Sequence, residues 1–148
     1  MKSAPQQVTF SGNFTYTLTP SYVNSDVLRC DFDEAITVYP FYSAGSGETS
    51  NTVSIQVQTN PLISEEDTGN LYWANAGGQY TNSSGTWTEE DATYTVSQGD
   101  AGTYEPGQPI VLGNMHAQQM RIKVKENGVA TNAGSLRLII VREANLRV

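Results

Sequence analysis

The sequence predicts an all-β protein: a single antiparallel β-sandwich or barrel-like domain, jelly-roll-like in style, behind a flexible N-terminal arm. Three observations support this prediction. Thr, Ser, Asn, Gln, Gly and aromatic residues dominate the chain, whereas the Ala, Leu, Glu and Lys that fill helices are scarce. Short runs that alternate apolar and polar residues recur along the chain, as half-buried strands do. Clusters of Gly, Asn, Ser and Pro separate these runs, which is typical of sandwiches and barrels.

The chain has the length of one domain. Its 148 residues can bury roughly 68–70% of the unfolded surface around a single core. Residues 1–7 hold Pro5, two Gln and no large apolar side chain except Met1, so we expect a flexible arm there. The single β domain is predicted to span residues 8–148. The one cysteine, Cys30, excludes an intramolecular disulfide.

The first predicted strand covers residues 8–19, V-T-F-S-G-N-F-T-Y-T-L-T. Its alternation puts the following residues on one face: Val8, Phe10, Gly12, Phe14, Tyr16 and Leu18. Gly12 indicates a bulge or bend within the strand. Pro20 ends it.

Further strands follow from the same period-two pattern. They are predicted at residues 27–32, 35–39, 52–59, 71–73, 93–96, 109–112, 120–125 and 136–142. The segments S-E-E-D at 64–67 and T-E-E-D at 88–91 resemble helix N-caps, and each predicts a single helical turn.

The last two strands are predicted to form a hairpin. Met120, Ile122 and Val124 alternate with a basic row, which consists of Arg121, Lys123 and Lys125. The returning run Leu138-Ile139-Ile140-Val141 is apolar on both faces. We therefore expect a second sheet to cover one face and a loop or a neighbouring subunit to cover the other. Ile139 and Val141 are the candidates for an oligomer interface.

The charges are polarised along the chain. The formal net charge is −7; residues 30–105 hold twelve acidic and no basic residues, while residues 121–147 hold six basic and two acidic ones. This balance argues against nucleic acid as a partner, because no excess of Lys and Arg is present to neutralise phosphates. No apolar run approaches the roughly 18 residues of a membrane span. The N-terminus also lacks the apolar core of a secretory signal, so we expect a chain that is used without export.

The sequence predicts neither an enzyme nor a cofactor. Its single His116 lies in a predicted loop, and Cys30 alternates with apolar residues as a buried thiol would. No nucleophile and base can be paired from these two residues, and zinc is disfavoured for the same reason. Acidic clusters could offer oxygen ligands to Ca²⁺, but none follows a calcium-loop pattern. Their members are Asp31, Asp33, Glu34, Glu65, Glu66, Asp67, Glu89, Glu90, Asp91 and Asp100.

Aromatic residues crowd the acidic middle of the chain. They are Tyr72, Trp73, Tyr80, Trp87, Tyr94 and Tyr104. Exposed aromatic rings on a β-sandwich can stack on sugar rings, which makes Trp73 and Trp87 candidates for glycan binding. The alternative is that these rings pack in the core and in subunit contacts.

The loose segment M-K-S-A-P-Q-Q, the Gly-, Asn- and Thr-rich body and the closing strands M-R-I-K-V-K and L-R-L-I-I-V-R resemble the small virion structural proteins of tailed bacteriophages. The resemblance is in particular to capsid decoration, or cementing, proteins. It implies a β-sandwich or β-tulip protein, frequently a homotrimer, that is made in the host cytoplasm. Such a protein sits on the capsid surface of the virion and clamps neighbouring subunits of the major capsid protein.

The resemblance suggests which residues would bind the partner. An arm that folds against a neighbour would include Lys2, Pro5, Gln6 and Gln7, while the basic row could face an acidic surface on that neighbour. The alternative for the basic row is a charged edge strand that blocks aggregation. Two other functions remain open: a carbohydrate-binding module for adhesion, and a metal-dependent enzyme that uses the acidic clusters.

Overall fold

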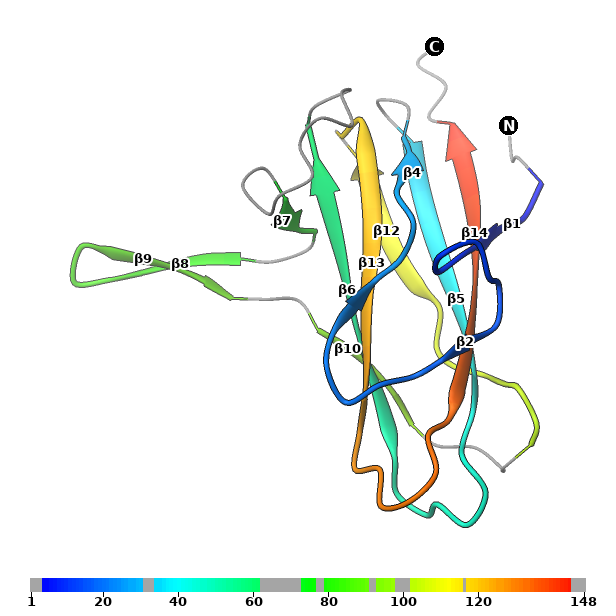
Figure 1. Cartoon of the computed structure of the whole chain (residues 1–148). Helices are drawn as coiled ribbons and strands as arrows, with labels where there is room; N and C mark the ends of the chain where they lie inside the picture. The colour runs from blue at the N-terminus through cyan, green and yellow to red at the C-terminus, as the bar shows by residue number, and fades with distance from the viewer. Residues whose placement is uncertain are drawn as a thin grey trace.

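The computed structural model describes residues 4–30, 34–61, 73–76, 79–90, 93–97, 102–115 and 117–144. These residues form fourteen strands and no helix. Twelve of the strands make two six-stranded antiparallel sheets, and the other two make a separate hairpin (Figure 1). The two large sheets face each other across one apolar core. The predicted antiparallel β-sandwich is therefore confirmed.

One sheet is named after its central strand β14 and is called the β14 sheet. Its strands are β1 (Gln6–Val8), β2 (Tyr16–Thr17), β5 (Glu34–Ser43), β11 (Glu105–Pro106), β12 (Ile110–Met115) and β14 (Ser135–Ala144). The order across it is β1, β14, β5 and β11, with β12 also on β5 and β2 also on β14.

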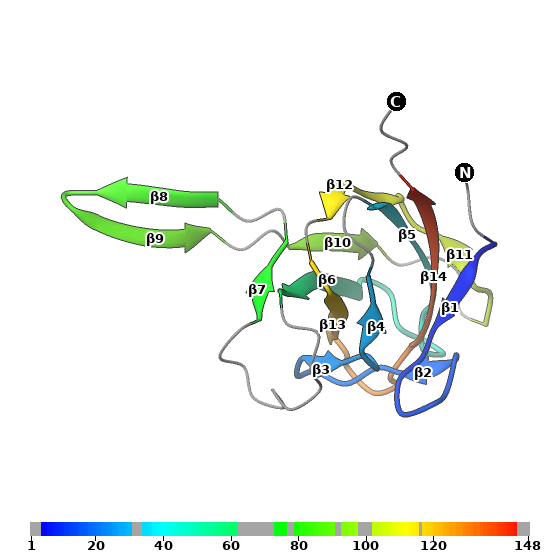
Figure 2. The ribbon, with the colours of Figure 1, turned by 90° about the horizontal axis from the view of Figure 1, so that it is seen from above.

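The opposing sheet is called the β13 sheet. Its strands are β3 (Val23–Asn24), β4 (Leu28–Arg29), β6 (Thr52–Asn60), β7 (Ala74–Asn75), β10 (Tyr94–Ser97) and β13 (Gln119–Asn127). The order is β10, β6, β13 and β3, with β7 also on β6 and β4 also on β13. Viewed from above, the two sheets lie opposite each other, and the N-terminal segment from β1 to β4 passes from the first to the second (Figure 2).

The core follows the period-two pattern of the four longest strands. Their inward residues are completely buried: Ile36 and Val38 from β5, Val53, Ile55 and Val57 from β6, Met120, Ile122 and Val124 from β13, and Leu136, Leu138 and Ile140 from β14. Burying one such side chain contributes about 1.5–3 kcal/mol relative to leaving it exposed. The inward face predicted for residues 120–125 is confirmed.

The prediction of one continuous strand over residues 8–19 is wrong. Ser11 and Gly12 both have positive φ, at 48° and 81°. Phe10 and Asn13 exchange both backbone hydrogen bonds across this two-residue turn, so the chain reverses where a bend was expected at Gly12. Asp26 secures the turn, because its carboxylate accepts the N–H groups of Ser11 and Gly12 at 3.1 and 2.9 Å.

Part of the predicted N-terminal arm belongs to the sandwich. Gln6 and Gln7 were expected in the arm, but they lie in β1 and pair with Ile140 and Ile139 of β14. Pro5 is exposed beside them. Lys2 lies outside the described residues, so its expected role in the arm stays a prediction.

The last two long strands do not form the predicted hairpin. β13 pairs with β6, whereas β14 pairs with β5 in the opposite sheet. The segment between them, residues 128–134, therefore crosses from one sheet to the other. The segment between β5 and β6, residues 44–51, makes the same crossing at the same end of the sandwich (Figure 1). Alternation predicts which residues face the core, but it does not predict which strand becomes the partner.

Two buried carboxylates hold these crossing segments together. Glu126 is 2% exposed; it accepts the hydroxyl of Tyr42 and, at 2.8 Å, the N–H of Gly134. Glu48 accepts the N–H groups of three consecutive residues of the other segment, Ala130, Thr131 and Asn132, at 2.6–3.1 Å. Glu48 thus joins the two connections to each other, while Glu126, near the end of β13, joins Tyr42 of β5 to Gly134 of the second connection.

The Tyr42 hydroxyl is expected to be a large contributor to stability. Burial and the Glu126 carboxylate raise the pKa of Tyr42 far above its usual value, so its proton stays available to Glu126. Tyr42→Phe leaves a buried carboxylate oxygen without this donor and should lower the free energy of unfolding by about 1–3 kcal/mol in urea titrations. Tyr39→Phe is the control, because the Tyr39 hydroxyl makes no hydrogen bond to the described residues. Equal losses for both variants would contradict the role assigned to Tyr42.

Glu48 should make stability depend on pH. The backbone N–H groups of Thr131, Asn132 and Ala130 lower the pKa of Glu48 below its usual value of 4.5. A lowered pKa in the folded state stabilises the protein above the unfolded pKa, and this stabilisation is lost as the pH falls through the folded pKa. Glu48→Gln should therefore destabilise the protein more at about pH 7 than at about pH 3 in thermal melts. A constant difference in melting temperature would refute this expectation.

Candidate functional site

The described residues contain no cluster of three or more His, Cys, Asp or Glu that could hold a metal ion. Cys30 is buried, as expected for a structural thiol. The other candidate ligands, His116 and the acidic residues Asp31, Asp33, Glu65, Glu66, Asp67, Asp91 and Asp100, lie outside the described residues. The described part of the chain also includes no helix that is long and apolar enough to span a bilayer.

The outer side of the β14 sheet carries large apolar side chains, and we call it the aromatic face. Its members are Phe14, Tyr39, Phe41, Tyr104, Val111, Arg137, Ile139 and Val141. The strand register places the strand residues of this face in three neighbouring rows across the sheet. Arg137 lies opposite Phe41, and Ile139 lies opposite Tyr39. Val141 and Val111 both lie opposite Thr37. Val111 is 73% exposed, and the other members are half-buried.

A hollow of about 190 Å³ opens in the aromatic face. It is lined by Phe14, Phe41, Tyr104, Arg137 and Ile139. The guanidinium carbon of Arg137 lies 4.0 Å from the ring centre of Tyr104 and 5.5 Å from that of Phe14. The cation is thereby set among aromatic rings, an arrangement that favours a guanidinium over an ammonium group.

Hydrogen bonds fix the orientation of this cation. The Nε of Arg137 donates to the hydroxyl of Thr15 at 3.0 Å, and the hydroxyls of Tyr104 and Ser135 are hydrogen-bonded at 2.7 Å. The two terminal amino groups of Arg137 make no hydrogen bond to the described residues. A guanidinium held in this way can donate two parallel hydrogen bonds to a carboxylate while the neighbouring rings contact an apolar or flat group.

The outward residues of the apolar run 138–141 take part in this face. Leu138 and Ile140 are buried against the β13 sheet, and Ile139 and Val141 are half-buried on the opposite side. The expectation that a second sheet covers one side of the run is therefore confirmed. Phe14 and Arg137 of the same chain flank Ile139, so the other side is only partly covered within the chain.

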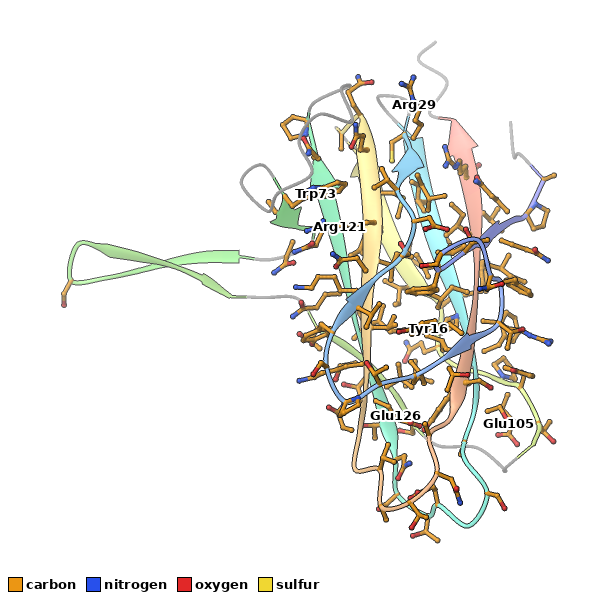
Figure 3. All side chains as sticks on the ribbon, viewed as in Figure 1. Tyr16, Arg29, Trp73, Glu105, Arg121 and Glu126 are labelled. Carbon is orange, nitrogen blue, oxygen red and sulfur yellow. The ribbon has the colours of Figure 1, made fainter. Side chains whose placement is uncertain are left out.

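The basic row does not lie on an edge strand. β13 has β6 on one side and β3 and β4 on the other, so the alternative of a charged edge strand is wrong. Arg121 is only 7% exposed, its Nε donates to Gln58 at 2.8 Å, and its guanidinium lies 4.3 Å from the ring centre of Trp73 (Figure 3). Arg121 is therefore bound within its own chain and unavailable to a partner.

The other two members of the basic row remain half-buried at the surface. The ammonium groups of Lys123 and Lys125 lie 5.1 and 4.7 Å from the ring centre of Tyr22. Both ammonium groups therefore contact the same ring at distances typical of cation–π pairs.

The two tryptophans proposed for glycan stacking do not form one site. Trp73 is half-buried, and one side of its ring is taken up by Arg121. Trp87 belongs to β9 (Thr86–Glu90), which forms a hairpin with β8 (Gln79–Ser83) at a distance from the body. The helical turn predicted at residues 88–91 is wrong, since Thr88, Glu89 and Glu90 lie in β9.

Of the residues of the hollow, sequence reasoning singled out only Ile139, as a candidate for an oligomer interface. Phe14 is placed by alternation on the same face as Val8 and Leu18 of a continuous strand, which the turn at Ser11 and Gly12 interrupts. Arg137 was counted only as a charge, and Tyr104 only as one of several aromatic residues. The signal that was present is the alternation of Arg137 with Leu136 and Leu138, which predicts an outward arginine beside Ile139.

Comparison with known proteins adds no assignment. No family model matches the sequence. No curated protein is significantly similar to it.

Arg121 and Lys125 should respond differently to the same substitution. Arg121→Met leaves the buried Gln58 carboxamide without its donor and removes the contact with Trp73, so it should cost about 1–3 kcal/mol of unfolding free energy. Lys125→Met, four residues further along the same face of β13, should change it by less than about 0.5 kcal/mol. Urea unfolding followed by tryptophan fluorescence measures both. Similar small effects would return Arg121 to the set of partner-binding candidates.

Proposed function

We propose that this chain is a non-enzymatic structural protein of a virion, which associates with itself and binds the major capsid protein as a capsid decoration protein. The observation that carries the proposal is the aromatic face, an outer sheet surface with Val111 exposed and six other apolar or aromatic side chains half-buried. Monomeric soluble proteins rarely expose large contiguous apolar patches, and those that do generally use them for binding.

The composition of the aromatic face supports a protein partner. Tyr, Phe and Arg are enriched at the centres of protein interfaces, and Lys, Glu and Asp are depleted there. The face has Arg137 at its hollow, with aromatic rings around it and no other charged residue among its members. A rigid body with such a face meets the requirements of a lattice-clamping protein, which needs a self-associating surface and no reactive site.

A second candidate function is favoured by the hollow itself. Aromatic walls from Phe14, Phe41 and Tyr104 beside a fixed arginine could hold a sugar ring through stacking and hydrogen bonds. This candidate replaces the earlier pair Trp73 and Trp87 as the place for glycan binding. Binding on a glycan array that is lost in Tyr104→Ala would support it; a flat array would remove its support.

Self-association is tested first by light scattering after size exclusion. The wild-type chain should elute as a stable closed oligomer, with a homotrimer favoured. Val111→Lys should shift it toward the monomer, since Val111 is exposed enough to be changed without disturbing the core. Val27→Lys is the matched control, because Val27 is a 49% exposed valine away from the aromatic face. A wild-type monomer at all concentrations would refute self-association.

Capsid binding is tested by co-sedimentation with assembled capsids of the encoding virus. A variant that lacks residues 1–5 retains β1 and hence the pairing of Gln6 and Gln7 with β14. If the arm contacts the major capsid protein, this truncation should weaken co-sedimentation without changing the oligomer mass. Unchanged capsid binding would remove the arm from the proposal, and absent binding by the full chain would overturn the decoration role.

A further inference from the structure

The hairpin of β8 and β9 stands apart from the sandwich. It forms a separate two-stranded sheet, closed by Ser84 and Gly85 at positive φ of 54° and 82°. In both views it extends away from the body on the side opposite β1 and β14 (Figures 1 and 2). A lone two-stranded hairpin is at best marginally stable in water. Packing against another surface would therefore stabilise it.

The hairpin is an insertion within one edge strand. Asn75 pairs with Gln58, and Ala76 continues this ladder by donating its N–H to the carbonyl of Val57 at 2.7 Å. On the other side of the hairpin, Tyr94 pairs with Ile55. Residues 76 and 93 thus lie opposite two consecutive residues of β6.

Side-chain hydrogen bonds support both halves of the interrupted strand. The carboxamide of Gln58 donates to Asn75, and that of Gln56 donates to Thr93, each at 3.1 Å. The edge strand would be continuous if residues 77–92 were removed. The pairing within the sandwich does not depend on them, so they are available for a contact outside the single chain.

The two faces of the hairpin differ in chemistry. Tyr80 pairs with Glu89 and Asn82 with Trp87, so strand alternation assigns these four residues to one face. The other face is polar and consists of Gln79, Thr81, Ser83, Thr86, Thr88 and Glu90. The first face thus combines two aromatic residues with one carboxylate.

This combination is complementary to the aromatic face of the β14 sheet. That face offers a hollow among aromatic rings and the terminal amino groups of Arg137, which suit an aromatic side chain and a carboxylate. The charges also fit, since no Lys or Arg occurs between Arg29 and Arg121. The hairpin extends away from the aromatic face of its own chain, so the complement must come from another copy.

We infer that the β8–β9 hairpin of one chain docks on the aromatic face of a second copy, with Glu89 of the first meeting Arg137 of the second. This inference rests on the self-association proposed above and names the segment that produces it. The contact joins two different surfaces, so repeating it from copy to copy generates a closed ring when the rotation closes.

A deletion tests the hairpin directly. The variant that joins Ala76 to Thr93 should keep the circular dichroism spectrum and cooperative melt of the wild type, because the edge strand remains paired with β6. Its mass in light scattering should fall from the oligomer to the monomer. A folded deletion variant that retains the wild-type oligomer mass would overturn the inference.

Charge reversal tests the pairing of residues and does not depend on the deletion. Glu89→Arg and Arg137→Glu should each shift the oligomer toward the monomer, since each places like charges together. The double variant should restore the oligomer mass. Glu90→Arg is the matched control, because Glu90 lies on the other face of the hairpin and its reversal should leave the mass unchanged. A double variant no better than the singles would refute the Glu89–Arg137 contact.

The two proposals fail in different ways. If the full chain is a monomer at every concentration, self-association itself is refuted and the inference falls with it. If the full chain is an oligomer and both the deletion and the charge reversals leave its mass unchanged, self-association stands and the hairpin inference alone is refuted.

Discussion

The buried carboxylate of Glu126 is the constraint on which the rest of the arrangement depends. A buried carboxyl group is tolerated only when hydrogen-bond partners surround it, and here the donors are the Tyr42 hydroxyl and the Gly134 N–H. Gly134 has no room for a side chain, since a Cβ would lie 2.5 Å from the Glu126 carboxylate and 2.7 Å from the carbonyl of Ser43. This close approach holds Gly134 against Ser43 at the end of β5, and the pairing of β14 with β5 begins at the next residue, Ser135.

The placement of β14 determines what the outer surface can do. Once Leu136, Leu138 and Ile140 fill the core, alternation directs Arg137 and Ile139 outward. The turn at Ser11 and Gly12, held by Asp26, brings the following segment back so that Phe14 lies over β14. The aromatic face is therefore assembled by contacts that also stabilise the fold, and its shape does not require a ligand to form.

The sequence predicted the fold class and the inward face of residues 120–125, because period-two alternation depends directly on burial. It did not predict that β13 and β14 belong to opposite sheets, since partner choice depends on long-range packing around Glu126. The strand at residues 8–19 was misassigned because Ser11 and Gly12 fit the alternation even while they form a turn. The hairpin was missed although its turn was visible as N-S-S-G, because the acidic residues after Trp87 resembled a helix cap.

The separation of acidic and basic residues along the chain corresponds to a separation in the folded structure. Acidic residues without basic neighbours would repel one another if the fold gathered them on one side, and the hairpin instead carries Glu89 and Glu90 away from the body. The outward arginine, Arg137, lies on a different surface with aromatic rings as its nearest neighbours. Opposite charges that cannot meet within one chain can meet between two chains, where they guide encounter and select the register. This is the physical basis of the proposal that the insertion, which contributes no pairing to either sheet, forms the contact between copies.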